Sequence, residues 1–316
     1  MEKILITGAA GFIGSHLSER LLSLGYDVYG LDNFDSFYEP SIKRNNVAPF
    51  KDHPRFTLIE GDIRDLPFIE DVFRKHSIDK IIHLAARAGV RPSIQLPLLY
   101  EDVNIKGTLN LLEISRTKLI KQFVFASSSS VYGGNLKIPF SETDPVDSPV
   151  SPYAATKKAG ELFCYNYHYL YRIPVTCLRF FTVYGPRQRP EMAIYNFARS
   201  IFKEIPFSIY GDGTIRRDFT YIEDIIDGIV LALENPFEYE IFNLGESETH
   251  SIENVIELLS KLIRKTAKIN FLPSEPGDML ITFADISKAR KILGYDPKIS
   301  LETGLKKFVK HLELNL

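Results

Sequence analysis

Cysteine is scarce in this chain. Among 316 residues there are two cysteines, Cys164 and Cys177, and they do not form a CxxC pair. Neither a disulfide framework nor a structural zinc site can be built from such a set. We therefore expect no bound metal and a reducing compartment, the cytoplasm.

The sequence also lacks long apolar runs and an excess of one charge. No stretch of about 18 apolar residues is present, and Gly8, Gly11 and Gly14 interrupt the apolar segment near the amino terminus. We therefore expect no membrane span and no signal peptide. The formal net charge of −2 predicts no general attraction to nucleic acid or to a membrane surface. An anionic substrate must then be held by local basic residues.

Short apolar segments alternate with amphipathic segments through the first half of the chain. The predicted strands are residues 3–7, 27–31, 55–60, 80–84, 122–126 and 175–180. The predicted helices include residues 12–24, 66–75, 103–118 and 154–171. This order predicts an α/β fold with right-handed crossovers and a doubly wound parallel Rossmann sheet. The polar stretch 34–53 is expected to be a loop.

The pattern changes after Gly185. Pro186, Pro190 and Pro206 separate shorter elements, and isolated amphipathic helices are predicted at residues 252–264 and 286–293. We predict a larger domain over residues 1–180, to which the chain returns near 217–245. A smaller α/β lobe, mainly residues 181–316, is expected over the carboxyl ends of the strands, where ligands of open α/β sheets bind.

A glycine-rich turn, TGAAGFIG at residues 7–14, joins the first predicted strand to the first predicted helix. Gly8, Gly11 and Gly14 permit a tight turn, contact of pyrophosphate with bare backbone, and close packing of the helix on the strand. The N–H groups at the start of the helix, near Phe12 and Ile13, attract phosphate. A glycine pattern alone is weak, but a preceding strand and a following helix are the context that a dinucleotide site requires.

Residues after the second and third strands extend this cofactor site. Asp32, about 20 residues beyond the turn, can accept hydrogen bonds from the adenosine ribose and would repel a 2′-phosphate. Neither Asn33, which we assign to the same site, nor Phe34 is basic, so the predicted cofactor is NAD rather than NADP. Asp62 and Ile63 are placed to bracket the adenine, although Asp62 could instead be a helix N-cap.

Tyr153 and Lys157 form a YxxxK pattern. On a helix, positions four apart share a face, so the lysine ammonium would lower the pKa of the phenol and reach the nicotinamide ribose. Upstream, the serine run SSSSVYGG at residues 127–134 ends a predicted strand. A hydroxyl there can orient a substrate hydroxyl toward the tyrosine. Each pattern is common by itself, and their combination carries the prediction.

Together, the glycine turn, HLAA at residues 83–86, SSSSVYGG and SPYAATK at residues 151–157 resemble the extended short-chain dehydrogenases/reductases over nearly the whole chain. The resemblance implies that the catalytic residues are Ser128, Tyr153 and Lys157. It also implies further contacts, to the cofactor by Leu84, Ala85 and Ala86 and to the substrate by Ser129.

The segment RFFTVYGPRQRP, residues 179–190, resembles the UDP-glucuronate 4-epimerase branch of that family. Galactose epimerases usually carry asparagine where this chain has Thr182. A threonine hydroxyl beside guanidinium groups suits a sugar carboxylate, because arginine offers a planar fork that matches it. Arg189, with Arg187 close by, is the candidate for that contact, and two surface arginines in a polar loop are the alternative.

Three more segments resemble substrate-binding parts of this branch. AGVR at residues 88–91 implies Arg91 near the substrate phosphates, and RRDFTY at residues 216–221 implies Arg217 on the diphosphate. PGD at residues 276–278 implies that Asp278 meets the uridine ribose. The predicted substrate is therefore a UDP-hexuronic acid, and a nucleic-acid or membrane partner is not expected.

The resemblance implies an NAD-dependent interconversion of UDP-glucuronic and UDP-galacturonic acid. Tyr153, as phenolate, would remove the proton of the C4 hydroxyl while hydride passes to NAD, and the 4-keto sugar would turn over before the hydride returns. A homodimer is implied as well, through the helices at residues 103–118 and 154–171.

Other functions remain open at this point. UDP-glucuronate decarboxylases resemble TSEVYG where this chain has Ser130 in place of the glutamate, which favours the epimerase. A UDP-glucose or UDP-N-acetylglucosamine 4-epimerase is a further alternative, and a 4,6-dehydratase typically has an Asp-Glu pair after the catalytic serine or threonine. A nucleotide-sensing module without catalysis usually lacks the tyrosine or lysine that stand here.

Overall fold

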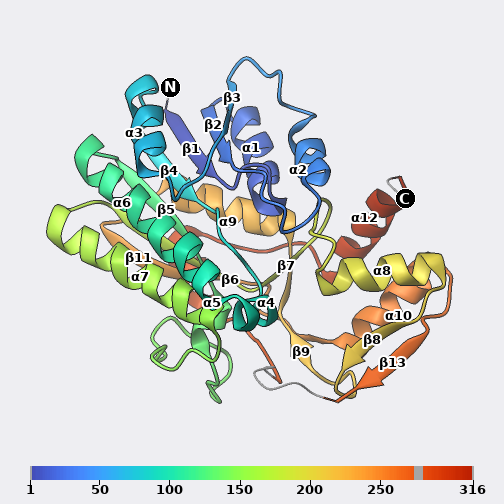
Figure 1. The fold of residues 1–316 in the computed structure, drawn as a ribbon. Helices are drawn as coiled ribbons and strands as arrows, with labels where there is room; N and C mark the ends of the chain where they lie inside the picture. Colours follow the sequence, from blue (N-terminus) through green and yellow to red (C-terminus); the bar gives the residue numbers. More distant parts are fainter. Residues whose placement is uncertain (1, 274–279, 315–316) are drawn as a thin grey trace. The chain divides into compact units, whose positions relative to one another are not determined.

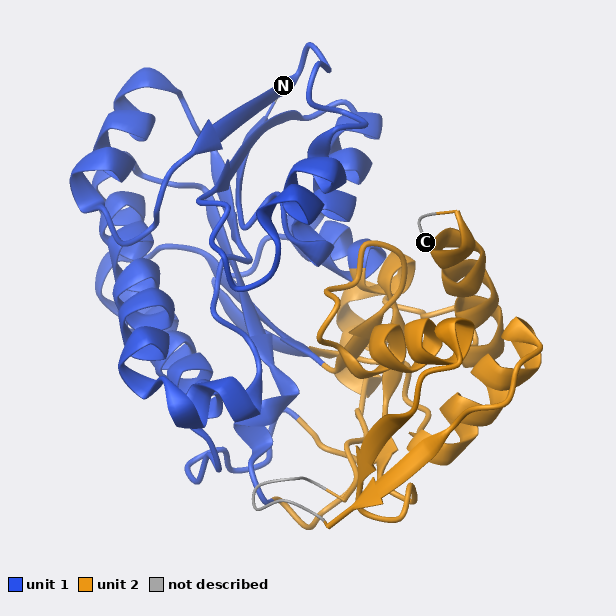
Figure 2. Ribbon diagram, turned by 45° about the vertical axis from the view of Figure 1, so that its right-hand side comes forward, with its two compact units in different colours: residues 1–134, 142–180, 226–242 blue, residues 135–141, 181–225, 243–316 orange. Residues whose placement is uncertain are grey.

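The computed structural model describes residues 2–273 and 280–314. The chain forms two compact units, drawn in different colours in Figure 2. Unit 1 consists of residues 1–134, 142–180 and 226–242, and unit 2 of residues 135–141, 181–225 and 243–316. Each unit is therefore assembled from three separate segments of the chain.

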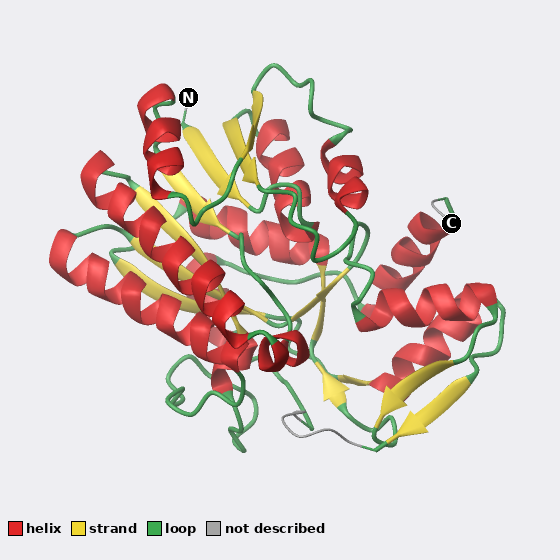
Figure 3. Ribbon diagram, in the orientation of Figure 1, coloured by secondary structure: helices red, strands yellow, loops and turns green. Residues whose placement is uncertain are grey.

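Unit 1 is built on a seven-stranded sheet of order β11-β6-β5-β4-β1-β2-β3, coloured yellow in Figure 3. Its strands are β1 (Lys3–Thr7), β2 (Asp27–Asp32), β3 (Phe56–Glu60), β4 (Lys80–His83), β5 (Gln122–Ser128), β6 (Val175–Phe180) and β11 (Tyr239–Leu244). The five pairings among β1 to β6 are parallel. The predicted doubly wound parallel sheet is confirmed, and its strand order reverses between β1 and β4.

Helices cover both faces of this sheet (Figure 1). One face carries α3 (Leu66–Lys75), α6 (Gly107–Lys118) and α7 (Pro152–Tyr171), whose apolar side chains join those of the strands in one buried cluster. The other carries α1 (Phe12–Ser23) and α9 (Ile222–Glu234). Shorter helical segments are α4 (Val90–Gln95), α5 (Pro97–Glu101), the π-helix η1 (Asp102–Lys106) and the 3-10 helix η2 (Ser129–Tyr132).

Local sequence explains where the long helices begin. At α7, Ser151 is the N-cap and its side chain accepts a hydrogen bond from the backbone N–H of Ala154, while Pro152 occupies the first turn. A capping hydroxyl satisfies one of the N–H groups that a helix start leaves without a partner, and proline fits there because it has no N–H. The start of α7 fixes Tyr153 in its first turn.

The stretch at residues 34–53, expected to be a loop, contains a helix, α2 (Pro40–Val47). Glu39 caps it and Pro40 occupies its first turn. The sequence of this helix is mostly polar and therefore predicted a loop. Two of its polar residues, Lys43 and Asn46, are nevertheless buried, and Asn46 donates to the Ala10 carbonyl at 3.0 Å. The loop prediction was therefore wrong over these residues.

Unit 2 contains α8 (Ala193–Lys203), α10 (Ile252–Ile263), α11 (Ser287–Leu293) and α12 (Leu301–Glu313). Its described strands pair in twos: β10 (Phe219–Tyr221) with β7 (Thr182–Tyr184), β12 (His250–Ser251) with β9 (Arg216–Arg217), and β13 (Ile269–Leu272) with β8 (Phe207–Tyr210). The Tyr184 hydroxyl donates to the carbonyl of Leu301 at 3.2 Å. This bond ties β7 to the start of α12.

Within residues 2–273 and 280–314, no helix combines the length and the apolar character that crossing a bilayer requires.

Candidate functional site

The glycine turn between β1 and α1 is closed against the neighbouring strands. The Gly8 N–H donates to Leu31 O of β2 at 2.8 Å, and the Gly11 N–H donates to Gly8 O at 3.0 Å. A Cβ on Gly8, which has φ +72°, would stand 2.9 Å from the Ala85 nitrogen, and one on Gly14 would stand 2.1 Å from Gly8 O. Only glycine fits at these two positions.

The start of α1 is open to a ligand. The N-cap is Gly11, and no side chain in the described part of the chain caps the helix there. Phe12 is buried in unit 1, whereas Ile13 is partly exposed. The first-turn N–H groups and the positive end of the helix dipole thus face the turn, an arrangement that binds phosphate oxygens.

Asp32 ends β2 and is 6% exposed. One carboxylate oxygen accepts from the Ala10 N–H at 3.0 Å and the other from the Phe34 N–H at 2.9 Å. Lys43 of α2 lies 3.9 Å from the same carboxylate. Burial raises the pKa of Asp32, and the Lys43 ammonium opposes that shift. No sequence pattern indicated Lys43, which is 11 residues from Asp32 in the stretch expected to be a loop.

Asp62 follows β3 and is held by a neighbouring arginine. Arg64 donates to both of its oxygens, at 2.9 and 2.8 Å, and the exposed Asn33 donates to it at 2.9 Å. Hydrogen bonding from Arg64 is the largest cause that lowers the pKa of Asp62 to about 2. The N-cap of α3 is Asp65, so the alternative role of Asp62 as a helix cap is wrong.

The side chain of Ile63 packs against α6 in the buried apolar cluster. Its side chain is 4% exposed, and a Cβ added to Gly107 of α6 would stand 2.4 Å from it. Any contact of Ile63 with a nucleotide would therefore involve its main chain.

The carboxyl ends of β1 and β4 meet where the strand order reverses. Thr7 is paired with His83 in the sheet, and its hydroxyl lies 2.7 Å from His83 Nδ1. The other ring nitrogen lies 3.0 Å from the Thr108 hydroxyl, and burial lowers the pKa of His83 to about 3. His83 is thus a neutral structural residue. The following Leu84, Ala85 and Ala86 are partly exposed at this reversal, which is where open α/β sheets bind ligands.

An ion pair joins two loops at this edge. Arg87 donates to Asp35 of the loop after β2, with a shortest distance of 2.8 Å, and its guanidinium lies 4.8 Å from the centre of the Phe37 ring. The Arg87 side chain is 15% exposed. No pattern in the sequence singled out this pair, because its partners are 52 residues apart.

Ser128, Tyr153 and Lys157 belong to two adjoining elements. Ser128 is the last residue of β5 and is 7% exposed, and its hydroxyl donates to the Ser130 hydroxyl at 3.1 Å. Ser129 follows in η2 and is partly exposed. Lys157 of α7 donates from Nζ to the Ala126 carbonyl of β5 at 2.7 Å. α7 is therefore held against the strand end that carries Ser128.

Tyr153 and Lys157 differ in their surroundings. The partly exposed Tyr153 ring packs edge-on against Tyr100, with 6.3 Å between ring centres. Lys157 is 5% exposed, and burial lowers its pKa to about 8, while the charge of Glu161 opposes that shift. A lysine whose pKa lies near neutrality can change its protonation state during a reaction.

Asn104 is a residue that the sequence reasoning missed. It lies in the π-helix η1 and is 3% exposed. Its amide accepts from the Arg87 N–H at 2.7 Å and donates to the Arg87 carbonyl at 2.9 Å and to the Thr156 hydroxyl at 3.0 Å. It therefore connects the loop after β4 to α7, next to Lys157. π-helical turns are frequent at functional sites.

The predicted arginines have different surroundings. Arg91 lies in α4 of unit 1 and is exposed. In unit 2, Arg189 pairs with Glu191 at 3.0 Å. Arg187 lies near His311 of α12, where burial first and the Arg187 charge second lower the pKa of the histidine.

The other predicted residues of unit 2 lie on short strands. Thr182 begins β7, and its N–H donates to the Asp218 carbonyl at 3.0 Å. Arg217 lies on β9, paired with His250. Asp278 lies outside the described residues.

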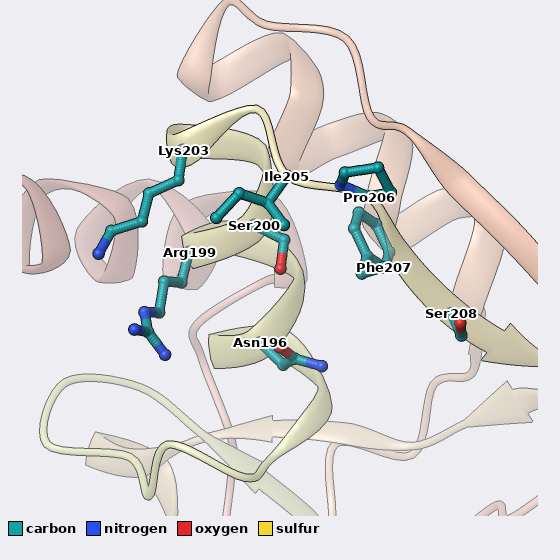
Figure 4. A pocket seen from close by; sticks show the side chains of 8 residues that line it. All are labelled: Asn196, Arg199, Ser200, Lys203, Ile205, Pro206, Phe207 and Ser208. Carbon is teal, nitrogen blue, oxygen red and sulfur yellow. The ribbon is translucent and has the colours of Figure 1, made fainter.

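A cavity of about 370 Å³ lies on unit 2 between α8 and β8 (Figure 4). Its lining includes the side chains of Asn196, Arg199, Lys203 and Ser208. None of the predicted site residues lines it.

Comparisons with known proteins match this chain over nearly its whole length. A family model described as GDP-mannose 4,6 dehydratase matches residues 5–308. The chain is 46% identical to a UDP-glucuronate 4-epimerase of Thermodesulfobacterium geofontis, over 100% of this chain and 98% of that protein.

Solved structures of nucleotide-sugar epimerases are also similar to this chain over nearly its whole length. A UDP-glucuronic acid 4-epimerase from Bacillus cereus, in complex with UDP-glucuronic acid and NAD, is 41% identical with a TM-score of 0.93 and covers 99% of this chain and 100% of its own. A UDP-glucose 4-epimerase from Thermotoga maritima is 33% identical with a TM-score of 0.91, covering 99% of each chain.

Proposed function

Because this chain belongs to the extended short-chain dehydrogenase/reductase family, we propose that it is an NAD-dependent UDP-glucuronate 4-epimerase. It interconverts UDP-glucuronic and UDP-galacturonic acid through a 4-keto intermediate. The observation that carries this function is the similarity, at 41% identity over essentially both full chains, to an epimerase in complex with UDP-glucuronic acid and NAD.

The residues of unit 1 fit NAD. Bare backbone at Gly8 and Gly14 leaves room for pyrophosphate, since a Cβ at either position would collide with main-chain atoms. Asp32 presents a carboxylate at the end of β2 for the ribose, and the start of α1 offers N–H groups to phosphate. Unit 1 is accordingly the NAD-binding part, and unit 2 is mainly the nucleotide-sugar lobe.

When bound, NAD would supply the acceptor for a hydride from the sugar C4 and the donor that returns this hydride to the opposite face, so the reaction has no net redox change. Tyr153 takes the proton of the C4 hydroxyl, and Ser128 orients that hydroxyl toward it. The Lys157 ammonium stabilises the phenolate of Tyr153, and its bond to the Ala126 carbonyl fixes its position.

The sugar carboxylate and the diphosphate require cations. We assign Arg189, with Arg187, to the carboxylate, beside the Thr182 hydroxyl. The ion pair of Arg189 with Glu191 joins Nε to one carboxylate oxygen at 3.0 Å, and a guanidinium has five N–H donors, so Arg189 can bind the sugar carboxylate while this pair is kept. Arg91 and Arg217 are assigned to the phosphates and Asp278 to the uridine ribose.

The test is an NMR time course of the purified protein with UDP-glucuronic acid and NAD. An equilibrium mixture with UDP-galacturonic acid, without carbon dioxide, is the expected result, and Tyr153→Phe is expected to abolish it. A pentose product would instead indicate a decarboxylase. Conversion of UDP-glucose or UDP-N-acetylglucosamine alone would retain Tyr153 and Lys157 and remove the role given to Thr182 and Arg189.

We also propose a homodimer that works in the cytoplasm. On α7, Leu162, Tyr165 and Tyr169 share one face and are 51 to 61% exposed, an apolar and aromatic surface of the kind found in subunit interfaces. Light scattering is expected to give about twice the 36.0 kDa of one chain, and a monomer would contradict the proposal.

A further inference from the structure

A buried ion pair joins α7 to β6 below the carboxyl end of β5. Glu161 of α7 and Arg179 of β6 each have a side chain that is 1% exposed. Arg179 donates from Nε and Nη2 to the two oxygens of Glu161, at 2.8 and 2.9 Å. Neither residue takes part in the proposed reaction steps.

The ion pair contacts the catalytic segment on both sides of Ser128. On one side, the Ser127 hydroxyl donates to Glu161 at 2.6 Å. On the other, Arg179 Nη1 donates to the Tyr132 hydroxyl at 2.9 Å, and its guanidinium lies 4.8 Å from the centre of that ring. Ser128 therefore lies in a short segment whose two ends are fixed by one ion pair.

The same ion pair continues the attachment of α7 to β5. Lys157 binds the carbonyl of Ala126, and Glu161, one helical turn later, binds the next residue, Ser127. Ser128 lies on β5, whereas Tyr153 and Lys157 lie on α7. The distance between the serine hydroxyl and the other two groups thus depends on how these two elements are held together.

We propose that Glu161 and Arg179 are positioning residues, which fix Ser128 relative to Tyr153 and Lys157 during epimerisation. This inference rests on the proposed function. The competing explanation is a purely structural ion pair. Buried ion pairs are poor sources of stability, because desolvation offsets their attraction, and this favours a positioning role.

The sharpest test removes the two contacts to the segment and keeps the ion pair. Ser127→Ala deletes the bond to Glu161, and Tyr132→Phe deletes the bond to Arg179. The matched control is Ser115→Ala in α6, where an equally buried hydroxyl donates to the Leu111 carbonyl at 2.7 Å. All three changes delete a single buried hydroxyl.

Each test variant is expected to lower kcat about tenfold or more, since displacements of about 1 Å in an active site can cost that much. KM for UDP-glucuronic acid and Tm should match those of Ser115→Ala. If kcat of both test variants stays within about twofold of the control, the positioning role is wrong. If kcat and Tm fall together, the ion pair is structural.

The charge of Glu161 provides a second measurement. Lys157 is faced by Cys164 and Glu161 of α7 and by His83 of β4, and among these the charge of Glu161 raises its pKa, since burial keeps the Cys164 thiol neutral. Glu161→Gln keeps an oxygen for Ser127 and removes the charge. In Glu161→Gln, kcat should therefore begin to fall at a lower pH on the alkaline side of its pH profile. In Ser127→Ala, the pH at which kcat falls should be the same as in the wild type. An unchanged pH of this fall in a folded Glu161→Gln variant would contradict the role of its charge.

Hydrogen exchange of residues 126–132 tests the positioning without any substrate. Both hydroxyl deletions are expected to speed exchange in this segment relative to Ser115→Ala. If the wild-type protein does not convert UDP-glucuronic acid, the proposed function fails, and the exchange rates still decide whether the ion pair orders the segment. Unchanged exchange in both variants would overturn the inference by itself.

Discussion

Replacing Gly14 with alanine should damage NAD binding, although the same change stabilises an ordinary helix. Gly14 lies in the first turn of α1, where alanine is usually better than glycine by about 1 kcal/mol. Here a Cβ would stand 2.1 Å from the Gly8 oxygen, 2.8 Å from the Gly8 carbonyl carbon and 2.9 Å from the Ala9 Cα. All three are backbone atoms, so no side chain can rotate away.

The size of the effect follows from these distances. Real Cβ atoms essentially never approach other heavy atoms closer than 3.0 Å, so the turn must open by about 0.9 Å, the difference between 3.0 and 2.1 Å. Such overpacking costs about 1–3 kcal/mol of stability. A shift of this size also displaces the N–H groups that face the cofactor, and we expect NAD affinity to fall about tenfold to a hundredfold.

The assay is calorimetric titration of the protein, stripped of nucleotide, with NAD, together with denaturant unfolding. Gly134→Ala is the matched control, because a Cβ there meets nothing within 4 Å. It should leave both quantities unchanged. Gly14→Ala that binds NAD within about twofold of wild type would refute the assignment of this turn to the cofactor.

Three further perturbations test other parts of the structure. The value of kcat should fall as the pH rises above about 8, where the buried Lys157 loses its proton, and a profile flat to about pH 10 would contradict this. Burial raises the pKa of Glu246 from 4.5 to about 8, so the folded protein loses stability as the pH rises between those values. Glu246→Gln should therefore raise Tm by about 2–4 °C at pH 8 and leave Tm unchanged near pH 4. An equal change in Tm at the two pH values would show that the raised pKa of Glu246 is not the cause. Arg87→Ala removes the pair with Asp35 and should speed NAD release several-fold in a nucleotide-exchange assay, whereas Arg74→Ala, which removes an exposed pair, should not.

The sheet of unit 1 could be predicted because buried parallel strands are continuous apolar runs with little dependence on the rest of the chain. Residues 3–7 and 175–180 were placed with the bounds that the structure has. The position of Asp32 at the end of β2 follows from the same regularity. Apolar patterns of this kind predict the order of the strands and helices along the chain and the residues at their ends.

Side-chain partners could not be predicted in the same way. The helix α2 was missed because its inward face carries Lys43 and Asn46, which a hydrophobic pattern reads as solvent-exposed. Arg189 and Arg187 were chosen for their residue type, but their pairing with Glu191 and their approach to His311 depend on how the loop after β7 folds. Asn104 carries no sequence signal, since its role arises from a π-helical turn.

The buried charges of unit 1 support the location of the site independently of any motif. Burying a charge is costly unless the charge is paired or hydrogen-bonded, so buried charged groups are few. Asp32 ends β2, and the pair of Glu161 and Arg179 lies at the ends of β5 and β6. Lys80 is also buried, at the amino end of β4, but it pairs with Glu2 at the sheet's opposite edge and donates to a main-chain carbonyl. Most of these buried charged side chains therefore lie at the carboxyl edge of the sheet, where open α/β sheets bind ligands. If they served only to stabilise the fold, there would be no reason for them to lie at that edge rather than at the other.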